Sequence, residues 1–113
     1  MKKRDTKLYV KDIVDSIKKI EQYTKGLTLE KFKKENLIID AVIRNFEIIG
    51  EASKNIPEKI KSQYPGLPWK EMAGMRDKVI HEYFGVDFDI VWKTISTRLA
   101  SLKKSLNNIY NSL

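Results

Sequence analysis

The strongest constraint on the fold is a repeat of apolar residues near the carboxyl end of the chain. Apolar positions there alternate steps of four and three residues: Phe88, Trp92, Ile95, Leu99, Leu102, Leu106, Ile109 and Leu113. That spacing puts them along one side of an α-helix and is typical of the seam by which helices pack together. The sequence therefore predicts a long helix from about residue 88 to the end, with Asp87 as its N-cap.

Two earlier segments are amphipathic in the same way. In the first, about residues 6–23, apolar side chains recur every three or four positions at Tyr9, Ile13, Ile17 and Ile20. Gly26 then ends this helix. The second, about residues 29–55, is apolar around more than half its circumference from Leu37 onward, so it is expected to be the central, most buried helix.

Two prolines organise the segment between these helices and the last one. Pro57 breaks the second helix and opens a short helix over residues 58–63. Pro68 suits the start of a further helix, from Trp69 to about Glu82, because its ring presets the helical backbone angle. No strand-like alternation competes with these signals.

The sequence therefore predicts an all-α, up-and-down bundle of four to five helices, with core seams from the second and last helices. With 113 residues, the chain is expected to form one domain over residues 1–113. The residues expected in the core are Phe46, Ile49, Trp92, Ile95 and Leu99. Trp69 and Trp92 are interpreted as core or interface anchors.

Composition narrows the functional classes. The chain has no cysteine, which excludes disulfides and thiolate metal sites. Its net charge of +7 favours binding to polyanions such as RNA. The basic residues are nevertheless dispersed along the chain, as on an ordinary solvated surface. No apolar run is long enough for a signal peptide or a membrane span, so we expect a cytoplasmic protein that does not contact membranes.

Charged residues form a stripe along the second predicted helix. They follow one another at steps of four, three, four and three residues: Asp40, Arg44, Glu47, Glu51 and Lys54. The stripe is either a solvent face or support for a site on a neighbouring helix. Glu47 and Glu51 could in principle hold Mg²⁺, but this alternative is not favoured, and no metal or cofactor is expected.

The chemistry is expected to reside in residues 75–83. His81 is the only histidine, which excludes the usual zinc sites, and Asp77 shares a helix face with it at a spacing of four. Arg76 is about 140° away around an ideal helix. It can converge with His81 only if both side chains reach over a helix edge, the helix ends early, or a second subunit closes the site. An arginine that holds phosphate and an imidazole that moves protons suffice for RNA cleavage. From spacing alone, an ordinary helix-surface pair remains the alternative.

A wider pattern surrounds these residues. It reads, in order, Asp40-Ala41-Val42, Arg44-Asn45, Glu47, Ile49-Gly50-Glu51-Ala52, Pro68-Trp69, Gly74-Met75-Arg76, His81, Tyr83 and Asp87. This pattern resembles HEPN domains, in particular the HepT-type toxins paired with minimal nucleotidyltransferases. Asp77 stands where that subgroup more often has Asn, and a carboxylate near RNA phosphate would lower activity or substrate affinity.

The resemblance implies a metal-independent endoribonuclease toxin that works as a homodimer on RNA. Arg76 and His81 would be the catalytic pair and Asp77 the supporting polar residue, while Glu47 and Arg44 are candidates for further support. The resemblance also implies that a partner nucleotidyltransferase antitoxin modifies Tyr83 with AMP. For an arbitrary tyrosine, a half-buried aromatic capping the bundle would be the plainer interpretation.

Two functions from other classes remain open. A HEPN domain that binds nucleotide or RNA and its nucleotidyltransferase partner without cutting RNA would need Arg76 but tolerate the loss of His81. A pure assembly domain would be indifferent to both substitutions.

Overall fold

The computed structural model describes the backbone of residues 5–81 and 88–113, and the side chains of residues 5–75 and 88–113. Within these ranges the chain forms helices and no strand, which confirms the predicted all-α class. The helices are α1 (Thr6–Thr24), α2 (Leu29–Lys34), α3 (Asn36–Lys54), α4 (Glu58–Gln63), α5 (Trp69–His81), α6 (Phe88–Thr97) and α7 (Leu99–Ser112).

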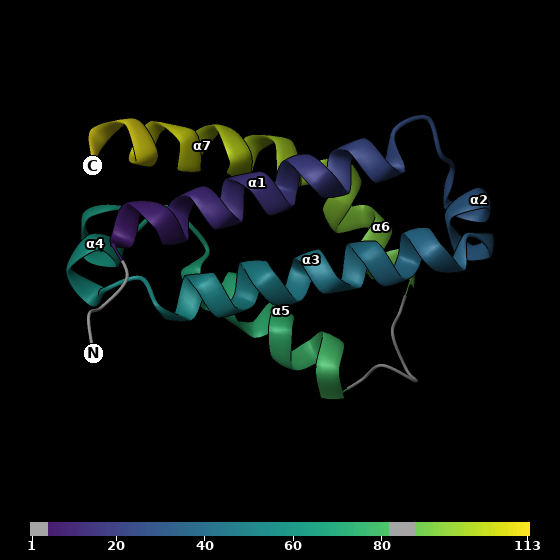
Figure 1. Ribbon diagram of the computed structural model, residues 1–113, viewed down its shortest axis with the longest axis horizontal. Helices are drawn as coiled ribbons and strands as arrows, with labels where there is room; N and C mark the ends of the chain where they lie inside the picture. The colour runs from purple at the N-terminus through teal and green to yellow at the C-terminus, as the bar shows by residue number, and fades with distance from the viewer. Residues whose placement is uncertain (1–4, 82–87) are drawn as a thin grey trace.

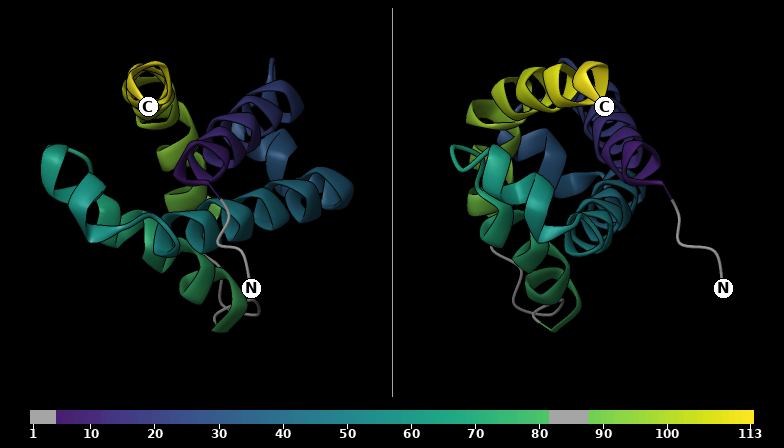
Figure 2. Two further views of the ribbon diagram at one scale, coloured as in Figure 1. Left: turned by 60° about the vertical axis from the view of Figure 1, so that its left-hand side comes forward. Right: turned by 90° about the vertical axis from the view of Figure 1, so that its left-hand side faces the viewer.

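The long helices are stacked side by side (Figure 1). α1 lies between α3 and α7 and runs antiparallel to both, while α5 contacts α3 from its other side. Figure 2 shows the same order from two further directions, with α7 and α5 at opposite edges of the molecule. The up-and-down bundle is therefore confirmed.

The core centres on α1 and α3. α3 contacts both α1 and α5, as expected of a central helix. The prediction that the core is formed by the second and last helices omitted α1, which packs between α3 and α7. Its fully buried side chains are Val10, Ile13, Ile17 and Ile20.

The Asp5 side chain caps α1 by accepting a hydrogen bond from the Lys7 N–H at 3.0 Å. Gly26, at φ 78°, makes the turn that follows α1.

The predicted continuous helix over residues 29–55 is wrong at Glu35. The backbone of this residue, at φ −101° and ψ 80°, ends α2 and precedes α3. The break lets α2 lie against α6, where the buried Phe32 ring meets Phe88 edge-on at 6.4 Å and Trp92 at 5.2 Å between centroids. The reason for the break is a tertiary contact, since no proline or glycine marks it in the sequence.

The predicted last helix is also divided, at Arg98. Its backbone, at φ −118° and ψ −34°, separates α6 from α7. Just before it, the Thr94 hydroxyl donates to the Ile90 carbonyl at 3.0 Å, and the Thr97 hydroxyl donates to the Lys93 carbonyl at 2.6 Å. Such hydrogen bonds back to the preceding turn bend helices. The two breaks turn five predicted helices into the seven described.

The break at Arg98 changes the burial of the predicted seam. Phe46, Ile49 and Leu99 are buried as predicted, but Trp92 and Ile95 are only half-buried, so the prediction was wrong for these two. All four buried residues of the seam lie in α7: Leu99, Leu102, Leu106 and Ile109. None of the residues of α6 is buried.

Candidate functional site

The backbone of α5 carries three of the predicted site residues, Arg76, Asp77 and His81. Because the helix runs without interruption to His81, an early end of the helix is not the way in which Arg76 and His81 converge. Reaching over a helix edge and completion by a second subunit remain. The side chains of these residues lie outside those that the structure describes, as do Tyr83 and the predicted N-cap Asp87.

Helix register divides the site residues between two stripes of α5. Arg76 follows the fully buried Met72 by four residues, so the two positions share one stripe of the helix backbone. Asp77 follows the half-buried Ala73 by four residues, and His81 follows Asp77 by four. By backbone register, Arg76 therefore falls on one stripe of α5 and the Asp77–His81 pair falls on the neighbouring stripe.

The start of α5 is held firmly by Trp69. Its indole Nε1–H donates to the Tyr64 carbonyl at 2.9 Å, and its side chain is buried. The Pro68 carbonyl accepts the first helical hydrogen bond, from the Met72 N–H at 2.9 Å. Trp69 is thus a core anchor, as predicted, and it fixes the direction in which α5 leaves the turn.

The charged stripe of α3 follows the solvent-facing part of that helix. Arg44 and Glu51 are exposed, while Glu47 is half-buried. α5 contacts α3, so the stripe belongs to one of the two elements that frame the site. The proposed support of Arg76 and His81 by Arg44 and Glu47 stays a prediction, because it concerns side chains beyond the described ones.

Asn45, beside this stripe, is a polar residue that was not predicted to belong to the site. Its amide Nδ2 donates to the Ala41 carbonyl at 2.8 Å, but its buried Oδ1 has no hydrogen-bond partner among the described residues. A buried acceptor without a partner is uncommon and often marks a functional constraint. Its signal in the sequence is an amide that lies between the apolar residues Val42 and Ile49, at a distance of three and four residues from them.

Metal ligands are not clustered in the described part of the molecule. Across the side chains of residues 5–75 and 88–113, no group of three or more His, Asp or Glu is placed to hold an ion. Within the described residues, no helix is both long enough and apolar enough to cross a bilayer.

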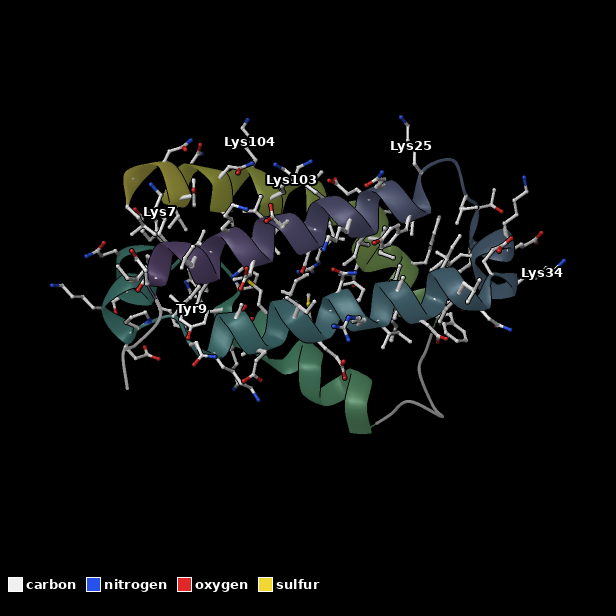
Figure 3. All side chains as sticks on the ribbon, viewed as in Figure 1. Lys7, Tyr9, Lys25, Lys34, Lys103 and Lys104 are labelled. Carbon is white, nitrogen blue, oxygen red and sulfur yellow. The ribbon has the colours of Figure 1, made fainter. Side chains whose placement is uncertain are left out.

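Lysines line the edge of the bundle opposite α5. Figure 3 shows Lys7, Lys103 and Lys104 on α1 and α7, and Lys25 just after α1. Lys7 lies over the Tyr110 ring at 4.6 Å from its centroid, and the Lys103 ammonium pairs with Glu21 at 2.6 Å. Part of this positive charge is thus used within the fold.

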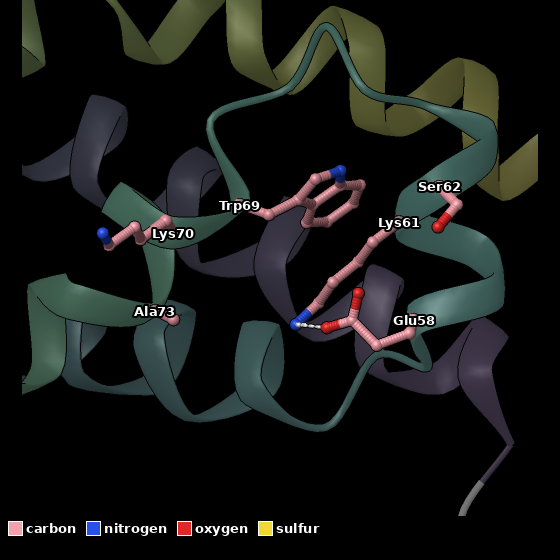
Figure 4. Close-up of a pocket in the computed structure, with 6 residues that line it drawn as sticks. All are labelled: Glu58, Lys61, Ser62, Trp69, Lys70 and Ala73. Atoms are coloured by element: carbon pink, nitrogen blue, oxygen red, sulfur yellow. Dashed lines mark ion pairs between the residues drawn. The ribbon is translucent and has the colours of Figure 1, made fainter.

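A pocket of about 450 Å³ lies between α4 and the beginning of α5 (Figure 4). Its lining residues are Glu58, Lys61, Ser62, Trp69, Lys70 and Ala73. It was not predicted from the sequence, because its residues come from two helices whose relative position depends on the 64–68 turn.

Comparison with known proteins covers nearly the whole chain. A family described as "Ribonuclease HepT-like" matches residues 13–109. A protein described as "Probable ribonuclease HepT" from Thermococcus cleftensis is 50% identical over 89% of this chain and 92% of its own length. A "Putative RNase" of Methanocaldococcus jannaschii is 45% identical over 100% of this chain and 97% of its own.

A second "Putative RNase", from Caldanaerobacter subterraneus, is 42% identical over 89% of this chain and 90% of its own length. No solved structure matches the chain. These matches confirm the family resemblance predicted from the sequence pattern.

Proposed function

This chain belongs to the family of HepT-like ribonucleases, and from that membership we propose that it is an endoribonuclease toxin controlled by a minimal nucleotidyltransferase antitoxin. The observation that carries the proposal is that the family match spans α5, whose unbroken backbone holds both Arg76 and His81.

The proposed reaction is cleavage of RNA by its own ribose. The 2′-OH attacks the adjacent phosphorus while one imidazole accepts its proton, and a second imidazole donates a proton to the departing 5′-oxygen. Arg76 stabilises the charge that grows on the phosphorane oxygens. The products end in a 2′,3′-cyclic phosphate and a 5′-hydroxyl. Because side chains supply every role, cleavage is expected without a metal ion.

The proposed active form is a homodimer. Each chain has one histidine, so a two-fold dimer supplies the base and the acid that a single chain lacks. The apolar surface of α6 supports this arrangement, since Phe88, Val91, Trp92 and Ile95 are only half-buried and Ile90 is 60% exposed. A partially uncovered apolar helix is a common feature of subunit interfaces.

The supporting roles follow the stripes described above. Asp77, four residues before His81, would accept a hydrogen bond from one ring nitrogen and thereby fix which nitrogen exchanges protons with RNA. Glu47, on the neighbouring α3, would accept a hydrogen bond from Arg76 and orient it, and Arg44 would add positive charge for the RNA phosphate. These roles are auxiliary, and their loss should lower activity less than the loss of Arg76 or His81.

Tyr83 is the proposed control point. Its phenolic oxygen would attack the α-phosphorus of ATP held by the antitoxin, so that a phosphodiester to AMP forms and pyrophosphate leaves. The bound adenylate, two residues from His81, would occupy the position of an RNA phosphate and pair with Arg76.

Intact-mass measurement after co-expression with the antitoxin tests this modification. The Tyr83→Phe variant should stay active in the presence of the antitoxin. Neutralisation of the wild type without added AMP mass would mean that the antitoxin acts by binding alone.

The catalytic proposal is tested with purified protein and a labelled RNA. His81→Ala and Arg76→Ala should each reduce cleavage by about 100-fold or more while the thermal melting curve stays near that of the wild type. Cleavage should persist in EDTA and leave cyclic phosphate ends. Activity that chelation abolishes and Mg²⁺ restores would contradict metal independence.

A mixture of His81→Ala and wild-type chains tests the shared site. If one cleft needs an imidazole from each chain, a mixed dimer holds only one and is inactive, so an excess of the variant should lower the wild-type activity. If each chain had a complete site, the wild-type activity would be unchanged. If the two single variants retain full activity, the chain is not this kind of nuclease. Binding of RNA that survives His81→Ala but not Arg76→Ala, without any cleavage by the wild type, would identify a binding module.

A further inference from the structure

We propose that the pocket between α4 and α5 is a subsite for single-stranded RNA, which holds a phosphate of a nucleotide flanking the cleaved bond. The inference rests on the proposed ribonuclease function and adds to it a place where the strand is held before it reaches His81.

The pocket has a rigid wall on one side. The Trp69 indole is buried and its Nε1–H is committed to the Tyr64 carbonyl, so its plane cannot swing into solvent. Figure 4 shows the Lys61 side chain extending from α4 past this indole toward Glu58. A fixed aromatic surface beside a held cation suits the apolar edge of a ribose next to its phosphate.

Charge in the pocket is available to an anion. The Lys61 side chain is only 17% exposed, whereas its partner Glu58 is 89% exposed and its carboxylate lies 4.0 Å from the ammonium. Because the carboxylate is exposed and lies at the outer limit of an ion pair, it contributes little, and a phosphate can replace it at small cost. Lys70, exposed on the other side, takes part in none of the ion pairs found among the described side chains, and the Ser62 hydroxyl adds a donor.

The pocket also lies in line with the proposed catalytic residues. Lys70 and Ala73 line it, and Asp77 and His81 continue the same stripe of α5 at further steps of four residues. Positions 73 and 81 are separated by about 12 Å along an ideal helix axis. A strand of a few nucleotides can therefore lie along one face of α5, with one phosphate in the pocket and the next ones toward His81.

The test uses the full-length ¹⁵N-labelled protein and an RNA octamer of mixed sequence with 2′-O-methyl on every ribose, which cannot be cleaved. Titration should shift the Trp69 indole N–H signal and the Ser62 and Ala73 amides together. A Trp92→Phe variant assigns the two indole signals. Because the octamer is uncleavable, this reading does not depend on catalysis.

Matched charge removals test the lysines. Lys61→Met keeps the aliphatic stem beside Trp69 and, combined with Lys70→Met, should weaken octamer binding by about 10-fold. The slope of log K against log salt should fall by about 0.7, since the pocket holds one phosphate and each single-strand phosphate contact contributes about 0.7. The control, Lys25→Met with Lys104→Met, removes equal charge from the far edge (Figure 3) and should leave the slope nearly unchanged.

Glu58→Gln provides a test in the opposite direction, because removing the competing carboxylate should tighten octamer binding by about 2-fold or more. Equal effects of both lysine pairs, or RNA-induced shifts that spare residues 62, 69 and 73, would overturn the subsite. The subsite would also be overturned if a mononucleotide reproduced the same shifts with the same affinity as the octamer. Cleavage of the unmodified octamer by the wild type is measured in parallel. If the octamer is cleaved but the pocket signals do not shift, only the proposed subsite is refuted. If the pocket signals shift but the octamer is not cleaved, only the proposed nuclease activity is refuted.

Discussion

α6 and α7 come from one continuous apolar repeat, yet they differ in what the repeat does. In α7 the repeat is buried from Leu99 to Ile109 and the helix contacts α1, whereas in α6 the same spacing leaves every residue at least partly exposed. The helix that closes the core and the helix that follows the proposed catalytic segment thus share a pattern but not a role. Periodicity predicts which side of a helix is apolar, and tertiary contacts decide whether that side is covered.

The largest expected effect concerns stability. Leu99→Ala removes a fully buried side chain at the start of α7 and should lower the free energy of unfolding by about 2–5 kcal/mol. Ile95→Ala, one turn earlier in α6, should cost less than half as much, because the side chain is already partly exposed. Urea unfolding of both variants measures the difference. Equal losses would contradict the division of the repeat at Arg98.

A second expected effect concerns assembly. Ile90→Glu puts a charge on the exposed side of α6 and should weaken the dimer by about 10-fold or more, while the stability of the fold changes by about 0.5 kcal/mol or less. Leu8→Glu, on an exposed position of α1, is the matched control and should leave the dimer intact. Sedimentation at several concentrations decides between them. A dimer insensitive to Ile90→Glu would place the interface elsewhere.

The smallest expected effect concerns the two ion pairs that attach these helices. Lys103, on α7, pairs with Glu21 of α1 at 2.6 Å with both side chains about one third exposed, and Lys103→Met should cost about 0.5–1 kcal/mol. Asp89, on α6, pairs with Lys33 at 3.0 Å in a more exposed setting. Lys33→Met should therefore change stability by about 0.3 kcal/mol or less. Thermal unfolding in low and high salt separates them, since only the first variant should differ measurably from the wild type.

Much of the fold followed from the sequence, because apolar spacing and the prolines act locally. The predicted bounds of α1, α4 and α5 agree with the structure to within one residue. The breaks at Glu35 and Arg98 did not follow from it. The first depends on Phe32 reaching α6, and the second on threonine hydroxyls bonding to the preceding turn, neither of which changes the apolar period.

The candidate site was predictable in part. The type and spacing of Arg76, Asp77 and His81 identified a helix face, and the family match confirmed the resemblance that gave these residues a role. The pocket near Trp69 and the Asn45 Oδ1, which has no partner among the described residues, could not be predicted, because both depend on which helices lie next to one another. The spacing of residues within one helix does not indicate which helix packs beside it.

The position of α1 between α3 and α7 has a consequence for how the chain folds. α1 and α3 are separated by a short connection, and α5 follows soon after, so these three helices can associate while the chain is still being made. The contact between α1 and α7 joins segments as far apart as Glu21 and Lys103, a separation of 82 residues. Closing so long a loop is slow relative to local pairing. The proposed catalytic helix can therefore be in place on α3 before α7 covers the other side of α1, and until then the chain exposes an apolar surface on which proteases and chaperones can act.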